Sequence, residues 1–176
     1  MTESATPHGS TMSQEQIEML FYGAARDGRL EMLGAFLDAG ADPNRPDARG
    51  FPPLILASYN GQLEATELLL RRGAAVDGRD SKGSTALAGV AFKGEVAVAR
   101  CLLDAGATVD APNEAGRTPL MFAVMFGRLE MAELLLAAGA DPERADAEGR
   151  TALTIAQASG SAALLECLYR AAGRKG

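Results

Sequence analysis

The stretch NEAGRTPLMFAVMFGRLEMAELLLAAGAD, residues 113–141, carries the start and stop signals of two short helices. Thr118 can accept a hydrogen bond from a backbone N–H at a helix start, and Pro119 suits the first helical position, where its missing N–H costs nothing. Gly127 follows the first helical run and Gly139 follows the second, and glycine is favoured just past helix ends. A segment rich in Asp, Pro and Gly comes next and favours a turn. The stretch therefore predicts a unit of helix, turn, helix and protruding loop.

The same unit recurs at a spacing of 33 residues, and the glycines reveal this spacing most clearly. Thirteen of the 20 glycines fall on three lines: Gly28, Gly61, Gly94, Gly127 and Gly160; Gly40, Gly73, Gly106 and Gly139; and Gly50, Gly83, Gly116 and Gly149. Leucine or phenylalanine follows the same register on two more lines: Phe21, Leu54, Leu87, Leu120 and Leu153; and Phe36, Leu69, Leu102, Leu135 and Leu168. A period of this length indicates a repeat array, in which each unit buries its apolar face against its neighbours.

These units resemble ankyrin repeats, whose pattern is D-x-x-G-x-T-P-L-H-x-A-x-x-x-G-x-x-x-x-x-x-L-L-x-x-G-A. The resemblance covers residues 14 to about 173 and is closest over 113–141. It implies an all-α repeat solenoid, an ankyrin stack of about five helix-turn-helix units with protruding β-hairpin-like loops. Where the family prefers His, the chain carries Ile55, Ala88, Met121 and Thr154. The hydrogen bonds that this His supplies between repeats are therefore expected to be missing, and stability to be modest for the length.

The sequence predicts a single ankyrin repeat domain over residues 13–176, preceded by a flexible leader over 1–12. The units are expected at 14–46, 47–79, 80–112, 113–145 and 146–176. The first and last units depart from the pattern, as terminal capping units do. Ser13 and Gln16 fit a capping box at the start of the first helix.

Charge and hydropathy narrow the classes of function. The formal net charge of −6 argues against a nucleic-acid partner, which would favour a basic surface. No window approaches the roughly 18 uninterrupted apolar residues of a membrane span. The start, MTESATPHGSTMS, lacks the basic and apolar regions of a secretory signal. A cytoplasmic protein without a membrane partner is therefore expected, and the heavy use of Ala, Gly and Arg fits a bacterial gene.

The sequence offers no set of residues suited to catalysis. His8 is the only histidine and lies in the leader, so no histidine-based catalytic or metal site can form in the repeats. Cys101 and Cys167 occupy the same position two units apart, a separation of about 20 Å at roughly 10 Å per helix layer, which is too far for a disulfide. We predict that both are buried core thiols. Glutamates of the second helices, such as Glu67 four residues before Arg71, suit surface ion pairs. We therefore predict no enzymatic activity, no cofactor and no metal.

In ankyrin repeats the first helices and the loop tips line a concave groove that holds the partner, and the resemblance implies the same surface here. Tyr59, Phe92 and Met125 share one position in register. With Phe126 beside Met125, they predict a row of large apolar side chains across the middle units. The predicted partner-binding residues are Arg49, Phe51, Tyr59, Asn60, Lys82, Phe92, Lys93, Arg117, Met125, Phe126 and Arg150. With Arg26, their cations predict a locally basic face on an acidic protein.

Exposed aromatic anchors among arginine and lysine are typical of interaction hot spots. They predict a non-enzymatic protein–protein interaction module whose partner has an acidic or mixed apolar-acidic surface, and which is a monomer when free. The resemblance also suggests an immunity or inhibitor protein for a toxin, or an accessory protein for an enzyme such as a catalase. A self-associating structural protein is a remote alternative, and an open groove disfavours a small-molecule site. A competing interpretation places Tyr59, Phe92 and Phe126 in the core.

Overall fold

The computed structural model describes residues 12–173, which form ten helices in five pairs. We number the pairs as units one to five. The helices are α1 (Gln14–Asp27), α2 (Leu30–Asp38), α3 (Pro53–Tyr59), α4 (Leu63–Arg71), α5 (Ala86–Lys93), α6 (Val96–Asp104), α7 (Pro119–Met125), α8 (Leu129–Ala137), α9 (Ala152–Ser159) and α10 (Ala162–Ala172). The leader predicted for residues 1–12 lies outside the described range apart from Met12, and so does His8.

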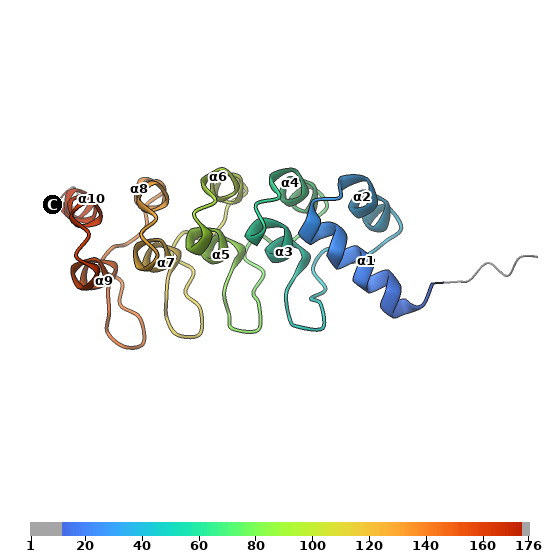
Figure 1. Ribbon diagram of the computed structural model, residues 1–176, viewed down its shortest axis with the longest axis horizontal. Helices are drawn as coiled ribbons and strands as arrows, with labels where there is room; N and C mark the ends of the chain where they lie inside the picture. Colours follow the sequence, from blue (N-terminus) through green and yellow to red (C-terminus); the bar gives the residue numbers. More distant parts are fainter. Residues whose placement is uncertain (1–11, 174–176) are drawn as a thin grey trace, which may run out of the picture.

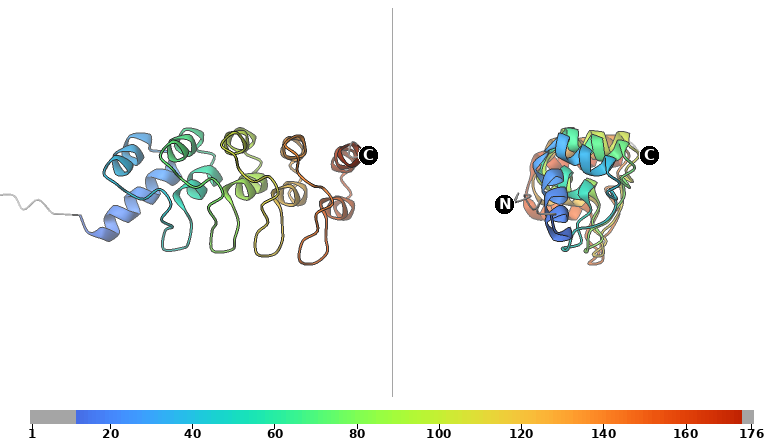
Figure 2. Two further views of the ribbon diagram at one scale, coloured as in Figure 1. Left: turned by 180° about the vertical axis from the view of Figure 1, so that it is seen from behind. Right: turned by 90° about the vertical axis from the view of Figure 1, so that its right-hand side faces the viewer.

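The helices form two rows, with the loops on one side (Figure 1). The odd-numbered helices pack on one another from α1 to α9, and the even-numbered helices form the second row. The loops project from the odd-numbered row, and both views in Figure 2 place them on the same side of the stack. No strand occurs in residues 12–173, where one isolated bridge joins Arg79 and Thr85. The architecture is the predicted all-α repeat solenoid.

The three glycine lines mark points where the backbone must turn. All 13 glycines on these lines have positive φ, from 67° at Gly127 to 95° at Gly139. Residues with a Cβ atom rarely adopt this conformation. The spacing of 33 residues therefore records a backbone requirement that returns once in every unit.

The predicted helix starts are confirmed. The Ser13 hydroxyl accepts the Gln16 N–H at 3.2 Å, and the Gln16 side chain accepts the Ser13 N–H at 2.8 Å, which completes a capping box. Thr118 accepts the Met121 N–H at 3.4 Å, and Pro119 is the first residue of α7. These bonds satisfy N–H groups that have no partner inside the helix.

The two apolar lines build one continuous core along the stack. Leu69, Leu102 and Leu135 of α4, α6 and α8 are fully buried, as are Leu87 and Leu120 of α5 and α7. Each unit supplies only a few such side chains, so their burial depends on the neighbouring units. No helix within residues 12–173 is long and apolar enough to cross a membrane.

The loops share one hydrogen-bonding scheme, built on the side chains at Asp47, Asp80, Asn113 and Asp146. In each, Oδ1 accepts the N–H groups two and four residues later, at 2.8–3.0 Å. Adjacent loops are also linked, because the Glu114 N–H donates to the Lys82 carbonyl at 3.1 Å and the Ala147 N–H donates to the Ala115 carbonyl at 3.0 Å. The loop tips are therefore held in fixed positions beside the first helices.

Hydrogen bonds between repeats come from a series of side chains that the sequence reasoning did not consider. Asn44, Asp77 and Asp110 stand 33 residues apart, and each accepts a backbone N–H from the following unit. Asp77 also accepts the Thr108 hydroxyl at 2.5 Å. These bonds connect successive units in a chain that lacks the His of the family pattern.

Candidate functional site

Three aromatic rings form a row along the ends of the first helices. Tyr59 ends α3, Phe92 lies near the end of α5, and Phe126 directly follows α7. The ring centroids of Tyr59 and Phe92 are 6.1 Å apart, and those of Phe92 and Phe126 are 4.2 Å apart. Tyr59 is 38% exposed and Phe126 43% exposed, while Phe92 between them is half-buried. The rings therefore support one another and keep an open surface.

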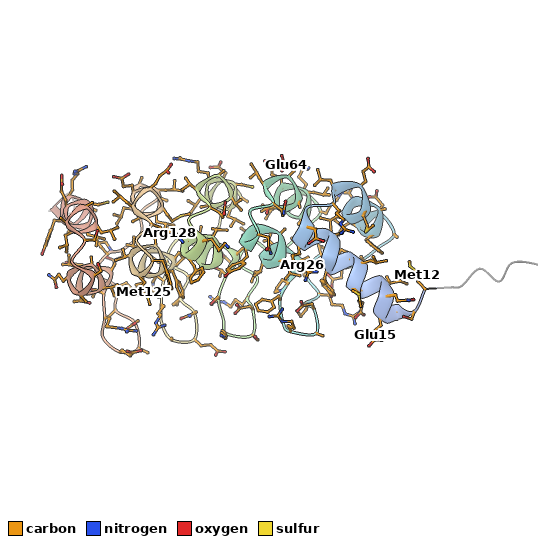
Figure 3. The ribbon with its side chains drawn as sticks, in the orientation of Figure 1. Met12, Glu15, Arg26, Glu64, Met125 and Arg128 are labelled. Atoms are coloured by element: carbon orange, nitrogen blue, oxygen red, sulfur yellow. The ribbon has the colours of Figure 1, made fainter. Side chains whose placement is uncertain are left out.

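Arg128 fixes the middle of this row from the next unit. Its Nε donates to the Phe92 carbonyl at 3.2 Å, and its side chain packs over Gly94, where a Cβ atom would meet Arg128 Cδ at 3.0 Å. Figure 3 shows Arg128 beside α5 and Met125 at the end of α7. Met125 is 36% exposed and extends the apolar surface beyond the rings.

A groove of about 590 Å³ lies between the first helices and the loops of units two to four. Seven of the predicted residues line it: Arg49, Phe51, Tyr59, Asn60, Lys82, Phe92 and Arg117. Phe122 packs against the core and also lines this groove. Asn60 uses its amide locally, since Nδ2 donates to the Leu56 carbonyl at 2.8 Å. Seven of the eleven predicted residues thus meet in one groove, and Lys93, Met125, Phe126 and Arg150 are not among the residues that line it.

Sequence reasoning missed the floor of the groove, which is made by Ala88 and Gly89 of α5. Units two and four carry Ile55–Leu56 and Met121–Phe122 at these positions. The signal was present as two small residues within a line of large ones. A Cβ atom on Gly89 would lie 3.3 Å from Tyr59 Cδ2, so the glycine also lets the Tyr59 ring lie close to α5.

The cations near the groove fall into two groups. The Lys93 ammonium lies 5.2 Å from the Tyr59 ring centroid, and the Arg49 guanidinium lies 5.2 Å from the Phe51 ring centroid. Lys82 is exposed on the loop of unit three. None of these three cations forms a salt bridge with another described residue.

The remaining predicted cations are neutralised, so the basic face is narrower than the sequence predicts. Arg26 pairs with Asp27 at 3.5 Å. Arg117 reaches Glu148 at 3.2 Å, and Arg150 reaches Asp146 at 2.8 Å and Glu148 at 3.0 Å. The Arg26 and Arg150 pairs are local in the chain, whereas Arg117 reaches the carboxylates of the next loop and depends on the stacking of adjacent loops.

Asp146 is the centre of the loop network in unit five, with a side chain only 1% exposed. Burial alone would raise the pKa of Asp146. Hydrogen bonds from the Arg150 guanidinium and from the N–H groups of Arg150 and Glu148 outweigh burial and hold the pKa below its ordinary value. The carboxylate is therefore charged at neutral pH and serves the loop structure.

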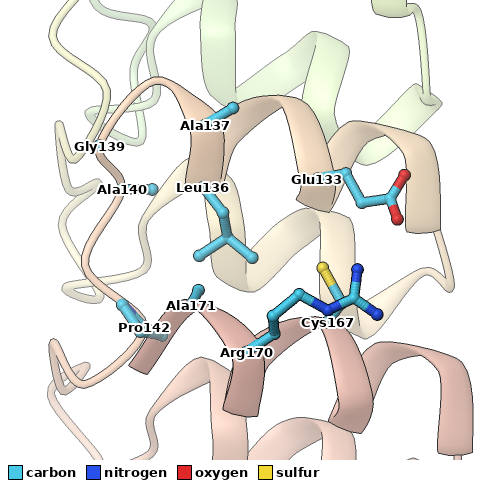
Figure 4. Close-up of a pocket in the computed structure, with 9 residues that line it drawn as sticks. All are labelled: Glu133, Leu136, Ala137, Gly139, Ala140, Pro142, Cys167, Arg170 and Ala171. Atoms are coloured by element: carbon cyan, nitrogen blue, oxygen red, sulfur yellow. The ribbon is translucent and has the colours of Figure 1, made fainter. Parts of the chain in front are cut away.

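The two cysteines are half-buried on the second helices, so the prediction that both are buried core thiols is wrong. They lie in the row of even-numbered helices, where the neighbouring helices of that row cover only part of each side chain. Cys167 borders a separate hollow of about 370 Å³, where Glu133 of α8 faces Cys167 and Arg170 of α10 (Figure 4). Burial raises the pKa of the Cys167 thiol, and the Glu133 charge raises it further. A thiol in this state is a weak nucleophile.

No group of three or more His, Cys, Asp or Glu residues within 12–173 is placed to hold a metal ion. The features that stand out are instead an open groove, a row of rings and rigid loop tips. Stacked helix pairs with these features define a helical repeat solenoid.

Two overlapping segments, residues 20–113 and 91–175, match the family model described as ankyrin repeats (3 copies). The chain therefore belongs to the ankyrin repeat family. A comparison with curated proteins found no match.

Proposed function

We propose that the chain is a non-enzymatic protein-binding module, which holds a partner protein in the groove and against the loop tips. The observation that carries this proposal is the row of Tyr59, Phe92 and Phe126, which keeps exposed ring surface beside unpaired cations. Large exposed rings next to cations are typical of binding hot spots. Ankyrin repeats are generally protein–protein interaction modules, which agrees with this function.

The charges around the row favour a partner with an apolar patch bordered by carboxylates. Arg49, Lys82 and Lys93 are the cations available for such a partner, because Arg117 and Arg150 already bind carboxylates of this chain. The free chain is a monomer in this proposal, and the rings become covered only in the complex.

A capture experiment tests the proposal. The full chain is immobilised and exposed to a lysate of its native organism, and the bound proteins are quantified by mass spectrometry. The test variant is Tyr59→Ala/Phe92→Ala/Phe126→Ala. The control is Tyr169→Ala, which removes a ring that is 53% exposed on α10, away from the groove. Circular dichroism and thermal unfolding verify that both variants are folded.

The expected result is a protein that the wild type and Tyr169→Ala capture equally and that the triple variant captures at least about tenfold less. Equal capture by all three proteins would contradict a binding role for the rings. If the captured protein is a second copy of this chain, and the molecular mass of the purified chain in solution rises with its concentration, the self-association alternative replaces the proposal.

A further inference from the structure

The groove is lined by two small residues at unit three, where the repeat pattern of large residues is locally interrupted. Ala88 and Gly89 form its floor, while Leu56 of unit two and Phe122 of unit four rise on either side. We call this depression the unit-three hollow. Ala88 is buried and Gly89 half-buried, so the floor is the helix surface itself and not a long side chain.

The walls of the hollow are held in place by contacts already described. Tyr59 stacks on Phe92 with an interplanar angle of 22°, and Phe92 contacts Phe126. The Arg128 bond to the Phe92 carbonyl holds the end of α5. A preformed apolar hollow binds a side chain at a lower entropic cost than one that must first be ordered.

The side of the hollow that faces the loops has a surplus of positive charge. Arg49 and Lys82 line the groove from two successive loops, and neither forms a salt bridge with a described residue. Asp80 also lines the groove, but its Oδ1 accepts the Lys82 and Ser84 N–H groups at 2.8 and 2.9 Å and is turned into the loop. Two cations are thus left facing one apolar depression.

We propose that the unit-three hollow receives one large apolar side chain from a segment of the partner protein, with an Asp or Glu beside it bound by Arg49 and Lys82. The fold fixes where each group of the partner lies across the groove, because the apolar floor belongs to α5 and the cations belong to the loops. Gly89 is then the residue that determines specificity, since a longer side chain there would push the Tyr59 ring out of place and narrow the space for the anchor. This inference rests on the proposed protein-binding function and names the chemistry of its central contact.

The test uses short random peptides displayed on phage and selected on the immobilised full chain. Enriched peptides are then titrated by fluorescence anisotropy against the wild type, Gly89→Leu and Gly89→Ala. Leucine is the residue at the equivalent position 56 of unit two, and at position 89 it would press on the Tyr59 ring and narrow the hollow. Alanine is the matched control, because it displaces Tyr59 by only a few tenths of an ångström and leaves the hollow open. Both substitutions replace glycine in the interior of α5, where they favour the helix.

Enriched peptides are expected to share a large apolar residue next to Asp or Glu. Gly89→Leu should weaken their binding at least about tenfold, and Gly89→Ala no more than about threefold. Replacing the peptide acid by its amide should weaken binding to the wild type but not to Arg49→Gln/Lys82→Gln. This double variant changes only exposed side chains and tests the charge contact without touching the core.

The outcomes separate this inference from the proposed function. Peptides that bind Gly89→Leu as tightly as the wild type, but lose binding to the triple ring variant, overturn the hollow and leave the protein-binding function standing. Peptides insensitive to both variants overturn both. The inference is also overturned if the enriched peptides carry no Asp or Glu. It is overturned as well if selection on the wild type enriches peptides no more than selection on Gly89→Leu does.

Discussion

Asp146 is the only buried charged residue in the described part of the chain. Its Oδ1 holds the loop through two backbone N–H groups, as Asn113 does in unit four, while its Oδ2 accepts two hydrogen bonds from Arg150. The comparison with Asn113 separates two roles. An amide oxygen is sufficient to accept the two N–H groups of the loop, and the negative charge of Asp146 forms the ion pairs with Arg117 and Arg150.

Asp146→Asn should keep the loop and change the pH dependence of stability. The folded pKa of Asp146 lies below its ordinary value, so the unfolded state binds more protons as the pH falls. The wild type should therefore be more stable than Asp146→Asn at pH 7, and this difference should shrink as the pH falls below about 4. Denaturant unfolding of both proteins at pH 7, 5 and 3 checks this. A difference that stays constant with pH would show that the ion pairs contribute no stability.

Side chains of this kind also show where sequence reasoning stops. The caps at Ser13 and Thr118 could be predicted because their partners lie three residues away. The pairing of Arg117 with Glu148 could not, since these residues are 31 positions apart and meet only when adjacent loops are stacked. The half-burial of Cys101 was missed for a similar reason, because the register gives the face of a helix but not the extent of its cover.

The helix pairs are joined by a polar series at Asn44, Asp77 and Asp110. Asn44 accepts the Ala75 N–H at 2.7 Å, and Asp77 accepts the Thr108 N–H at 3.0 Å. An oxygen acceptor is the feature that Asn44, Asp77 and Asp110 share, whether it belongs to an amide or to a carboxylate. Each bond links the end of one unit to the end of the next.

Asp77→Ala should lower the free energy of unfolding by about 1 kcal/mol, because the Thr108 N–H and hydroxyl lose their acceptor. Asp77→Asn should lose less, since an amide oxygen serves at the equivalent Asn44. Equilibrium unfolding in urea measures both. Equal losses from the two variants would show that the charge, and not the acceptor, holds the units together.

The stack as a whole was largely predictable, and the shape of its groove was not. Glycines with positive φ and leucines on the core side return with one period, so local signals define every unit. The unit-three hollow has a different origin. It exists because Ala88 and Gly89 lie between larger neighbours, Leu56 and Phe122, and only the stacked units bring these residues together.

The central claim is that the rings form a surface for a partner and are not part of the core, and the unfolding free energy of Phe126→Ala tests it most directly. Phe126 is 43% exposed and its ring contacts Phe92, so removal of the ring should cost about 1 kcal/mol. Leu135→Ala, at a fully buried position in α8, should cost about 2–5 kcal/mol in the same assay. A loss from Phe126→Ala as large as that from Leu135→Ala would contradict the account and place the ring in the core.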